Sequence, residues 1–324
     1  MRLLKLVPDA TNVEFSRWRH LAMGISVLLI IASIALVAVR GLNLGVDFVG
    51  GQMVRVTFVQ PVEVDELRGT VSSLGLGDPS IQQFGSPRDV SIRMPLPEGG
   101  DGAADAAANK LKQAIKAQHP DASFGSVDTV SGKVSKELFR TGAISMSLAM
   151  LAISIYIWFR FEWQFGIGAL FALVHDVALT FGFFALTQLE FDLNSVAAIL
   201  TIIGYSLNDT IVVYDRIREN LRKYRKMEII PLLDLSVNET LSRTIMTSLS
   251  MIVALAALLL WGPEVIFGFT AAMLLGIFVG TYSSIYMAAP ILIWLKVGPH
   301  SFIAKESAVA RGAERMGPVD GAQP

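Results

Sequence analysis

Four long stretches of this chain carry no charged side chain. They cover residues 21–39, 142–159, 244–261 and 265–295. A helix needs about 20 apolar residues to cross the hydrocarbon core of a bilayer. With 52% hydrophobic and 17% charged residues, the chain is also too apolar for an ordinary soluble domain, in which about 25% of residues are charged. The sequence therefore predicts membrane-spanning helices.

Two further apolar stretches, 165–189 and 195–214, contain a few ionisable side chains. We count them as spans, which gives six. The last span is long enough to tilt or to break, and Pro290 is the predicted point of the break. The apolar run of the first span exceeds the core of about 7–15 residues that is typical of a signal peptide, so we expect it to remain as an anchor.

The basic residues predict the orientation of these spans. They cluster before the first span, between the fourth and fifth, and after the last: Arg2, Lys5, Arg17, Arg19, Arg216, Arg218, Arg222, Lys223, Arg225, Lys226, Lys296, Lys305, Arg311 and Arg315. The positive-inside rule places these segments, and both termini, in the cytoplasm. The predicted organisation is a cytoplasmic N-terminus (1–20), a first span (21–39), a periplasmic domain (41–139), five further spans (140–295) and a disordered cytoplasmic tail (296–324).

The long outer segment carries the pattern of a small α+β domain. Alternating or apolar runs predict strands at 53–59, 80–84, 89–94 and 122–130, helices at 62–74 and 103–118, and a turn at 85–87. The order β-α-β-β-α-β is typical of a ferredoxin-like unit. The predicted fold is therefore an α-helical integral membrane protein, with a ferredoxin-like periplasmic domain between its first and second spans.

Composition excludes several kinds of site. The chain has no cysteine, so it forms neither disulfides nor thiolate metal sites. Its histidines, His20, His119, His175 and His300, lack the spacing of metal ligands. The net charge of −1 argues against nucleic-acid binding. We expect no metal and no bound cofactor.

A glycine-rich element follows the first span. Gly45, Gly50 and Gly51 enclose Asp47 and Phe48. The glycines allow unusual backbone angles at the entrance to the outer domain, although a simple turn-rich linker has the same composition. A phosphate-binding loop is not expected, because no Walker-type lysine follows.

The fourth span contains a carboxylate, Asp209, four to five residues from its cytoplasmic end, and Gly204, Tyr205 and Asn208 lie close to it. An ionised Asp at the centre of a span costs about 2.5–3.5 kcal/mol, so Asp209 should face the bundle or a water-filled cavity. It is either a proton- or ion-carrying carboxylate or the donor or acceptor of a structural hydrogen bond between helices.

Three further features of the spans have two interpretations each. Arg243, at the cytoplasmic end of the fifth span, is a counter-charge for Asp209 or an ordinary interfacial anchor. His175 and Asp176, near the middle of the third span, are a second proton-handling element or a buried pair that locks helices together. A stripe of small residues in the sixth span indicates close packing against an internal neighbour or a partner protein: Gly268, Ala272, Gly276 and Gly280.

Together these motifs resemble the SecF family of bacterial protein-export membrane proteins. The resemblance covers residues 15–300 and is carried by five elements: 45–51, His175-Asp176, 204–220 with Asp215 and Arg216, 238–244 with Asn238, Glu239 and Thr240, and 276–286. The long motif in the fourth span is the most specific of them.

The resemblance implies a function. It implies a six-span protein of the resistance-nodulation-division superfamily in the bacterial inner membrane, which pairs with SecD and works beside the SecYEG channel. Such a protein uses the proton-motive force to pull unfolded preproteins outward after SecA has pushed them. The membrane carboxylate and arginine of the family correspond to Asp209 and Arg243. The proton is the coupling ion, and no enzymatic activity is implied.

Other functions remain open from the residues alone. An intramembrane protease would need Ser206 and His175 as a pair, but no Gly-x-Ser-x-Gly element surrounds the serine. A complete transporter for a small solute would also use a membrane carboxylate. A structural scaffold of the channel would leave Asp209 without a role. Six spans with one such carboxylate resemble half of a transporter, because ion sites lie between two repeats.

Overall fold

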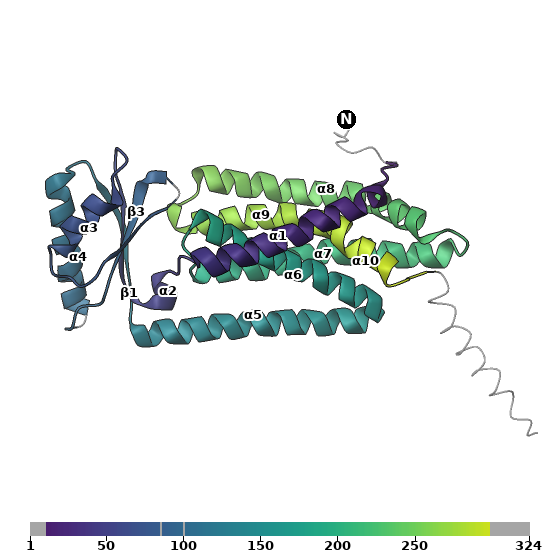
Figure 1. Cartoon of the computed structure of the whole chain (residues 1–324), viewed down its shortest axis with the longest axis horizontal. Coiled ribbons are helices and arrows are strands. Elements are labelled where there is room, and N and C mark those ends of the chain that lie inside the picture. Colours follow the sequence, from purple (N-terminus) through teal and green to yellow (C-terminus); the bar gives the residue numbers. More distant parts are fainter. Residues whose placement is uncertain (1–10, 85, 100, 299–324) are drawn as a thin grey trace, which may run out of the picture.

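The computed structural model describes residues 11–84, 86–99 and 101–298. It has two parts, a bundle of long helices and a small sheet domain at one end of that bundle (Figure 1). The connection between α7 and α8, which carries the basic cluster, lies at the opposite end. The predicted disordered tail falls almost wholly outside the described residues.

Within the described residues, six helices are long and apolar enough to cross a membrane, as the sequence predicts. They are α1 (Arg19–Arg40, continuing the short η1, Phe15–Trp18), α5 (Gly132–Arg160), α6 (Trp163–Thr187), α7 (Leu193–Lys223), α8 (Ile229–Trp261) and a last span that begins with α9 (Phe267–Ser283). Several extend beyond the apolar run, because the hydrogen-bond ladder continues into water after the membrane core ends.

The last span does not break at Pro290. A π-helical turn (Ser284–Ala288) follows α9, and α10 (Ala289–Trp294) continues the span with Pro290 in its first turn. A proline ring collides with the carbonyl four residues earlier and offers no N–H. The wider π turn absorbs this mismatch without ending the helix, and such turns recur at functional sites.

The bundle is layered by burial. At the centre are α6, α7 and the last span, which bury 56%, 50% and 56% of their most apolar windows, whereas α5 and α8 bury 11% and 17%. The apolar core between the central helices is formed by Phe165, Phe184, Ile199, Ile202, Ile203 and Tyr214. The outer surfaces of α5 and α8 therefore depend on lipid or on another protein for cover.

The sheet domain has the predicted β-α-β-β-α-β order, and its strands pair antiparallel in the order β2-β3-β1-β4. Its elements are β1 (Gly51–Thr57), α3 (Val64–Ser72), β2 (Ser80–Phe84), β3 (Ser86–Met94), α4 (Asp101–Gln118) and β4 (Ser123–Val130). The sequence did not predict the short helix α2 (Val46–Val49), and it placed Ser86 and Pro87 in a turn. Both belong to β3, because the hairpin is tighter than expected.

The two faces of the sheet differ. Alternate residues such as Val54, Val56 and Ile92 are fully buried against Leu67 of α3 and Leu111 of α4. The opposite face is polar and turns toward the helical bundle, with Arg55, Asp89 and Arg93 among its side chains. The domain thus closes its own apolar core and meets the bundle through polar groups.

Candidate functional site

Asp209 lies on α7 and is 3% exposed. Its Oδ2 atom is buried and has no hydrogen-bond partner among the described residues. A buried polar atom without a partner is unfavourable and is rare in folded proteins. Asp209 is therefore a carboxylate that the folded chain leaves unsatisfied.

Arg243 of α8 is the arginine that the sequence analysis relates to Asp209. It is exposed on the bundle surface. Both residues are described, and neither a hydrogen bond nor an ion pair within 4.0 Å joins them. The described structure therefore has no direct contact between this guanidinium and the carboxylate, and the pairing of the two residues stays a prediction.

Several polar residues are exposed on the surfaces of α7 and α8 in the region of Asp209. Thr201, Gly204 and Asn208 of α7 are exposed, as are Arg243 and Thr247 of α8. We call these five residues the open face. A Cβ at Gly204 would meet nothing within 4 Å. Polar and charged side chains rarely face lipid at membrane depth, because water cannot satisfy them there.

On its other side, α7 meets a closed polar cluster formed by His175, Asp176, Ser206 and Ser283. His175 Nδ1 lies 2.8 Å from Asp176 Oδ1, and Ser283 Oγ donates to Asp176 Oδ2 over 2.8 Å. Ser206 Oγ donates to the same oxygen. All four residues are at least 98% buried. The Asp176 cluster therefore ties α6, α7 and α9 together.

The chemistry of the Asp176 cluster differs from that of a protease. Ser206 donates its hydroxyl to the carboxylate of Asp176 and not to His175, so these residues lack the contact between nucleophile and base. His175 Nε2 is buried without a partner among the described residues. Both oxygens of the Asp176 carboxyl group therefore have hydrogen-bonding partners.

The small residues of the last span face α7. A Cβ at Gly276 would overlap Ile202, and one at Gly280 would lie 3.0 Å from Ser206 Cβ. Ala272 is fully buried. Gly268 is different, because its nearest neighbour would be Glu190 O at 3.8 Å, beside a cavity at the end of the bundle next to the sheet domain. The close neighbour of Gly276 and Gly280 is therefore internal.

The remaining motif residues of α7 and α8 form ion pairs and hydrogen bonds toward the ends of these helices that lie away from the sheet domain. Asp215 pairs with Arg160 at 2.7 Å, and Arg216 pairs with Glu239 at 2.7 Å. Asn238 binds the backbone of Val13 through both ends of its amide. Thr240 donates to Ser236 O over 3.1 Å. These contacts join α5, α7, α8 and the N-terminal segment.

The glycine element adopts the special backbone that its sequence predicts. Gly50 and Gly51 have φ angles of 77° and 112°, which side chains rarely tolerate. Phe48 packs against Phe139 and Phe191, with ring centroids 5.8 Å apart in each pair. Asp47 Oδ2 accepts a hydrogen bond of 3.1 Å from the backbone N–H of Leu193. The element is thus an ordered connection to α7.

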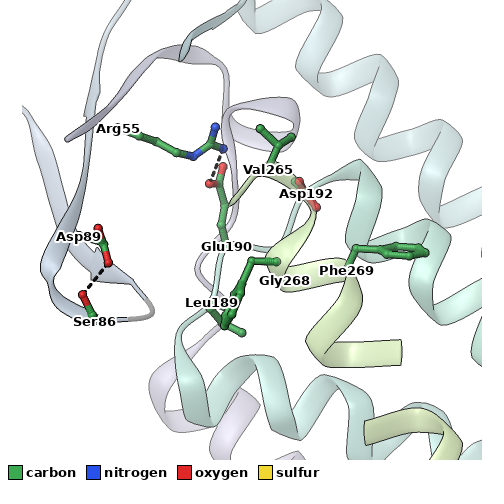
Figure 2. A pocket seen from close by; sticks show the side chains of 10 residues that line it. Arg55, Ser86, Asp89, Leu189, Glu190, Asp192, Val265, Gly268 and Phe269 are labelled. Atoms are coloured by element: carbon green, nitrogen blue, oxygen red, sulfur yellow. Dashed lines mark hydrogen bonds and ion pairs between the residues drawn. The ribbon is translucent and has the colours of Figure 1, made fainter. Parts of the chain in front are cut away.

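Sequence reasoning missed two residues beside this element, Arg55 and Glu190. Arg55 Nη2 lies 3.1 Å from Glu190 Oε2. Figure 2 shows the two side chains pointing toward each other. Burial raises the pKa of the Glu190 carboxyl, and the positive charge of Arg55 opposes that shift. They border a cavity of about 340 Å³ whose other wall is apolar, with Val265 and Phe269. The only sequence signal is that the loop 190–194 carries acidic but no basic residues.

Two family models match the chain. "Protein export membrane protein SecD/SecF, C-terminal" matches residues 110–298, and "SecD/SecF GG Motif" matches residues 35–62. The second match contains the glycine element, and the first contains Asp209, Arg243 and the Asp176 cluster.

Curated relatives and solved structures agree with these models. The chain is 46% identical to the protein translocase subunit SecF of Rhodobacter capsulatus, over 90% of this chain and 91% of the relative. It is 42% identical to the SecF subunit of Rickettsia felis, over 89% and 94%. The crystal structure of SecDF from Thermus thermophilus, a translocon-associated membrane protein, matches with a TM-score of 0.80 and 33% identity.

The match to SecDF covers 90% of this chain but only 40% of the solved chain. The chain therefore spans less than half the length of that structural relative, while it spans almost the whole length of the SecF relatives. With 46% identity over nine-tenths of its length and six helices suited to a bilayer, the chain belongs to the SecF family of protein translocase subunits and is a multi-pass membrane protein of the Sec export pathway.

Proposed function

We propose that this protein couples proton flow to late steps of preprotein translocation, and that Asp209 carries the proton. The observation that carries the proposal is the unsatisfied carboxylate oxygen of Asp209, buried next to the open face. Adding a proton removes a costly buried charge, whereas losing it restores the attraction to Arg243. No other bound group is needed, and the protein is not an enzyme.

The orientation follows from the distribution of basic residues. The loop after α7 holds Arg222, Lys223, Arg225 and Lys226 and lies at the opposite end of the bundle from the sheet domain (Figure 1). The positive-inside rule puts this loop and both termini in the cytoplasm and the sheet domain in the periplasm of the inner membrane. Protons then enter from the side of the sheet domain.

The open face is proposed to receive SecD. Exposed Asn208 and Arg243 are unsuited to lipid, and Gly204 leaves room for a closely packed helix. The SecDF relative is more than twice as long as the part that matches this chain. A second half of the same kind, in a separate SecD chain, would cover Asp209 and complete a site between two repeats.

The energetics suit this coupling. A proton that moves down a membrane potential of 100 mV releases about 2.3 kcal/mol. That energy drives movement only if the protonated and ionised forms favour different arrangements of the two halves. The preprotein would leave the SecYEG channel, driven first by SecA, on the side where the sheet domain stands. The Asp176 cluster is proposed to lock the helices that carry the site.

The test is a translocation assay in liposomes that contain SecYEG, SecD and this chain. SecA and ATP start translocation of a preprotein, ATP is removed, and a proton gradient is imposed. We expect the gradient to speed completion with the wild type and to have no effect with Asp209→Asn, which keeps the shape of the side chain but cannot ionise.

Glu219→Gln is the matched control, because it neutralises an exposed carboxylate on the same helix. It should respond to the gradient as the wild type does. A wild-type response from Asp209→Asn, with equal amounts of assembled complex, would refute the role of Asp209.

A further inference from the structure

The sheet domain is attached to α7 through a few defined contacts. The linker after α1 and the loop before α7 run side by side, and Leu44 forms a parallel bridge with Phe191. Gly45 N donates to Phe191 O over 3.0 Å, and Phe191 N donates to Asn43 O over 2.7 Å. The backbone of the glycine element is therefore joined to the segment that leads into α7.

Asp47 adds a contact to α7 itself. Its carboxylate accepts from the N–H of Leu193, the first residue of α7. Asp192 and Ser195 form a capping box at the same helix end. The first N–H groups of a helix have no partner within the helix and carry a partial positive charge, so a carboxylate there is stabilising. The N–H group of Leu193 thus finds its acceptor in the glycine element and not within α7.

Arg55 makes the second connection. Its Nη1 atom lies 2.8 Å from Asp128 Oδ2 within the sheet domain, and its Nη2 atom lies 3.1 Å from Glu190 Oε2 in the loop before α7. The side chains of Arg55 and Glu190 are only 16% and 18% exposed, so solvent screens this pair less than a surface ion pair. A Cβ at Gly45 would come within 2.5 Å of Glu190 Oε1, which explains the glycine.

The sheet domain is less constrained on its other side. The cavity of about 340 Å³ separates Arg55 and Asp89 from Val265 and Phe269 at the outer end of α9 (Figure 2). The domain is thus held at the beginning of α7 and, through the glycine element and β4, at the beginning of α5, whereas a cavity lies toward α9. An attachment on one side with space on the other allows rotation about that attachment.

Asp209 stands on the same helix as the attachment. From Leu193 to Lys223, α7 is one continuous helix, so its first residue moves with the segment that carries Asp209. We infer that Asp47 and the Arg55–Glu190 ion pair form a two-point joint, through which the sheet domain follows movements of α7. The inference rests on the proposed function of Asp209. Asp47 and Glu190 are positioning residues in it.

The joint can be tested in the full-length chain, because the protein has no native cysteine to interfere with labelling. Spin labels are attached at Gln113→Cys on α4 and Leu260→Cys on α8, both exposed. Their distance is measured in lipid nanodiscs with and without Asp209→Asn. We expect a narrow distribution in both chains, with a shifted mean in the Asp209 variant.

Removing both contacts of the joint should make the label distance independent of the change at Asp209. Asp47→Ala combined with Glu190→Gln should broaden the distribution and abolish the shift caused by Asp209→Asn. Asp47→Asn retains an acceptor for the Leu193 N–H and should restore much of the narrow distribution. Asp128→Asn is the matched control, since it removes the partner of Arg55 that lies inside the sheet domain and leaves the connection to Glu190.

Each contrary result overturns the joint. An unchanged distribution in the combined variant means that other contacts hold the domain. An equal shift in intact and cut chains means that α7 reaches the sheet domain by another route. No shift in the intact chain means that no movement is transmitted. The export assay above then decides separately whether Asp209 carries the proton, because that assay does not depend on label distances.

Discussion

Two buried carboxyl groups lie on opposite sides of α7, and their surroundings differ. Toward α6 and α9, Asp176 is surrounded by three donors and the helices approach closely at Gly276 and Gly280. Toward α8, Asp209 has an oxygen without a partner and lies beside exposed polar residues. The carboxyl group on one side of α7 thus has partners at both oxygens, whereas the one on the other side has an oxygen without a partner.

This difference is the basis for proposing Asp209, and not Asp176, as the carboxylate that changes its charge. A change of protonation at Asp176 would leave at least one of its donors without an acceptor, which costs about 1–3 kcal/mol per buried group. At Asp209 no hydrogen bond to the unpartnered oxygen has to be broken first. The environment of Asp209 therefore suits the proposed gain and loss of a proton, and the environment of Asp176 suits a fixed contact between helices.

The largest effect on stability is expected from Asp176→Ala. It removes the hydrogen-bonding partner of His175, Ser206 and Ser283 in a fully buried place, and each buried polar group left without a partner costs about 1–3 kcal/mol. Thermal unfolding of the isolated chain in detergent should show a much lower midpoint. Asp209→Ala, the matched change on the other side, should lower it far less. If both variants lowered the unfolding midpoint by similar amounts, the two carboxyl groups would not differ in their contribution to stability.

A smaller loss is expected from Gly276→Ala. The added methyl group overlaps Ile202 of α7, and overpacking a filled core costs about 1–3 kcal/mol. Gly268→Ala is the control from the same stripe, because its Cβ would meet only Glu190 O at 3.8 Å. We expect it to be neutral in the same unfolding measurement. Equal effects at both positions would contradict the internal contact of the stripe.

Patterns that depend on one helix or strand could be read from the sequence. The six spans follow from the length of the apolar runs, and the β-α-β-β-α-β order follows from the alternation of apolar and polar residues. Both features are present in the structure. The pairing of His175 with Asp176 was also within reach, because the residues are adjacent. What the sequence could not show is which side chains of other helices join them.

Contacts between distant segments were out of reach for a physical reason. Ser283 lies 107 positions from Asp176, and Glu190 lies 135 positions from Arg55. In the sequence, Ser283 resembles any other serine and Glu190 any other loop carboxylate. Nothing local to either residue indicates its distant partner. Pro290 was recognised as a disturbance, but the response of the helix, a π turn instead of a break, depends on packing around it.

On the open face, Gly204→Ala should change the stability of the chain in the opposite direction from Gly276→Ala. Nothing lies within 4 Å of the added Cβ, and alanine favours a helix interior over glycine by about 0.5–1 kcal/mol. The isolated chain should therefore unfold at a slightly higher temperature. Gly204→Leu should in addition weaken co-purification with SecD, because it fills the space left for a partner helix. A lower unfolding temperature for Gly204→Ala would show that this face is already occupied within the chain.

The smallest effect is expected from Arg243→Lys. Arg243 is exposed and touches Asp209 through no hydrogen bond or ion pair, so a surface change of this kind should alter the free energy of unfolding by less than about 0.5 kcal/mol. Lysine keeps the positive charge but lacks the planar fork of arginine. Because the attraction acts through space, the lysine variant should retain most of its response to a proton gradient in the export assay, whereas Arg243→Gln should lose it. If lysine fails as glutamine does, a forked contact with Asp209 must form at another stage of the cycle, when the partner covers the open face. If the Arg243→Gln variant responds to the gradient as the wild type does, Arg243 is only an interfacial anchor. Asp209 then acts without a counter-charge from this chain.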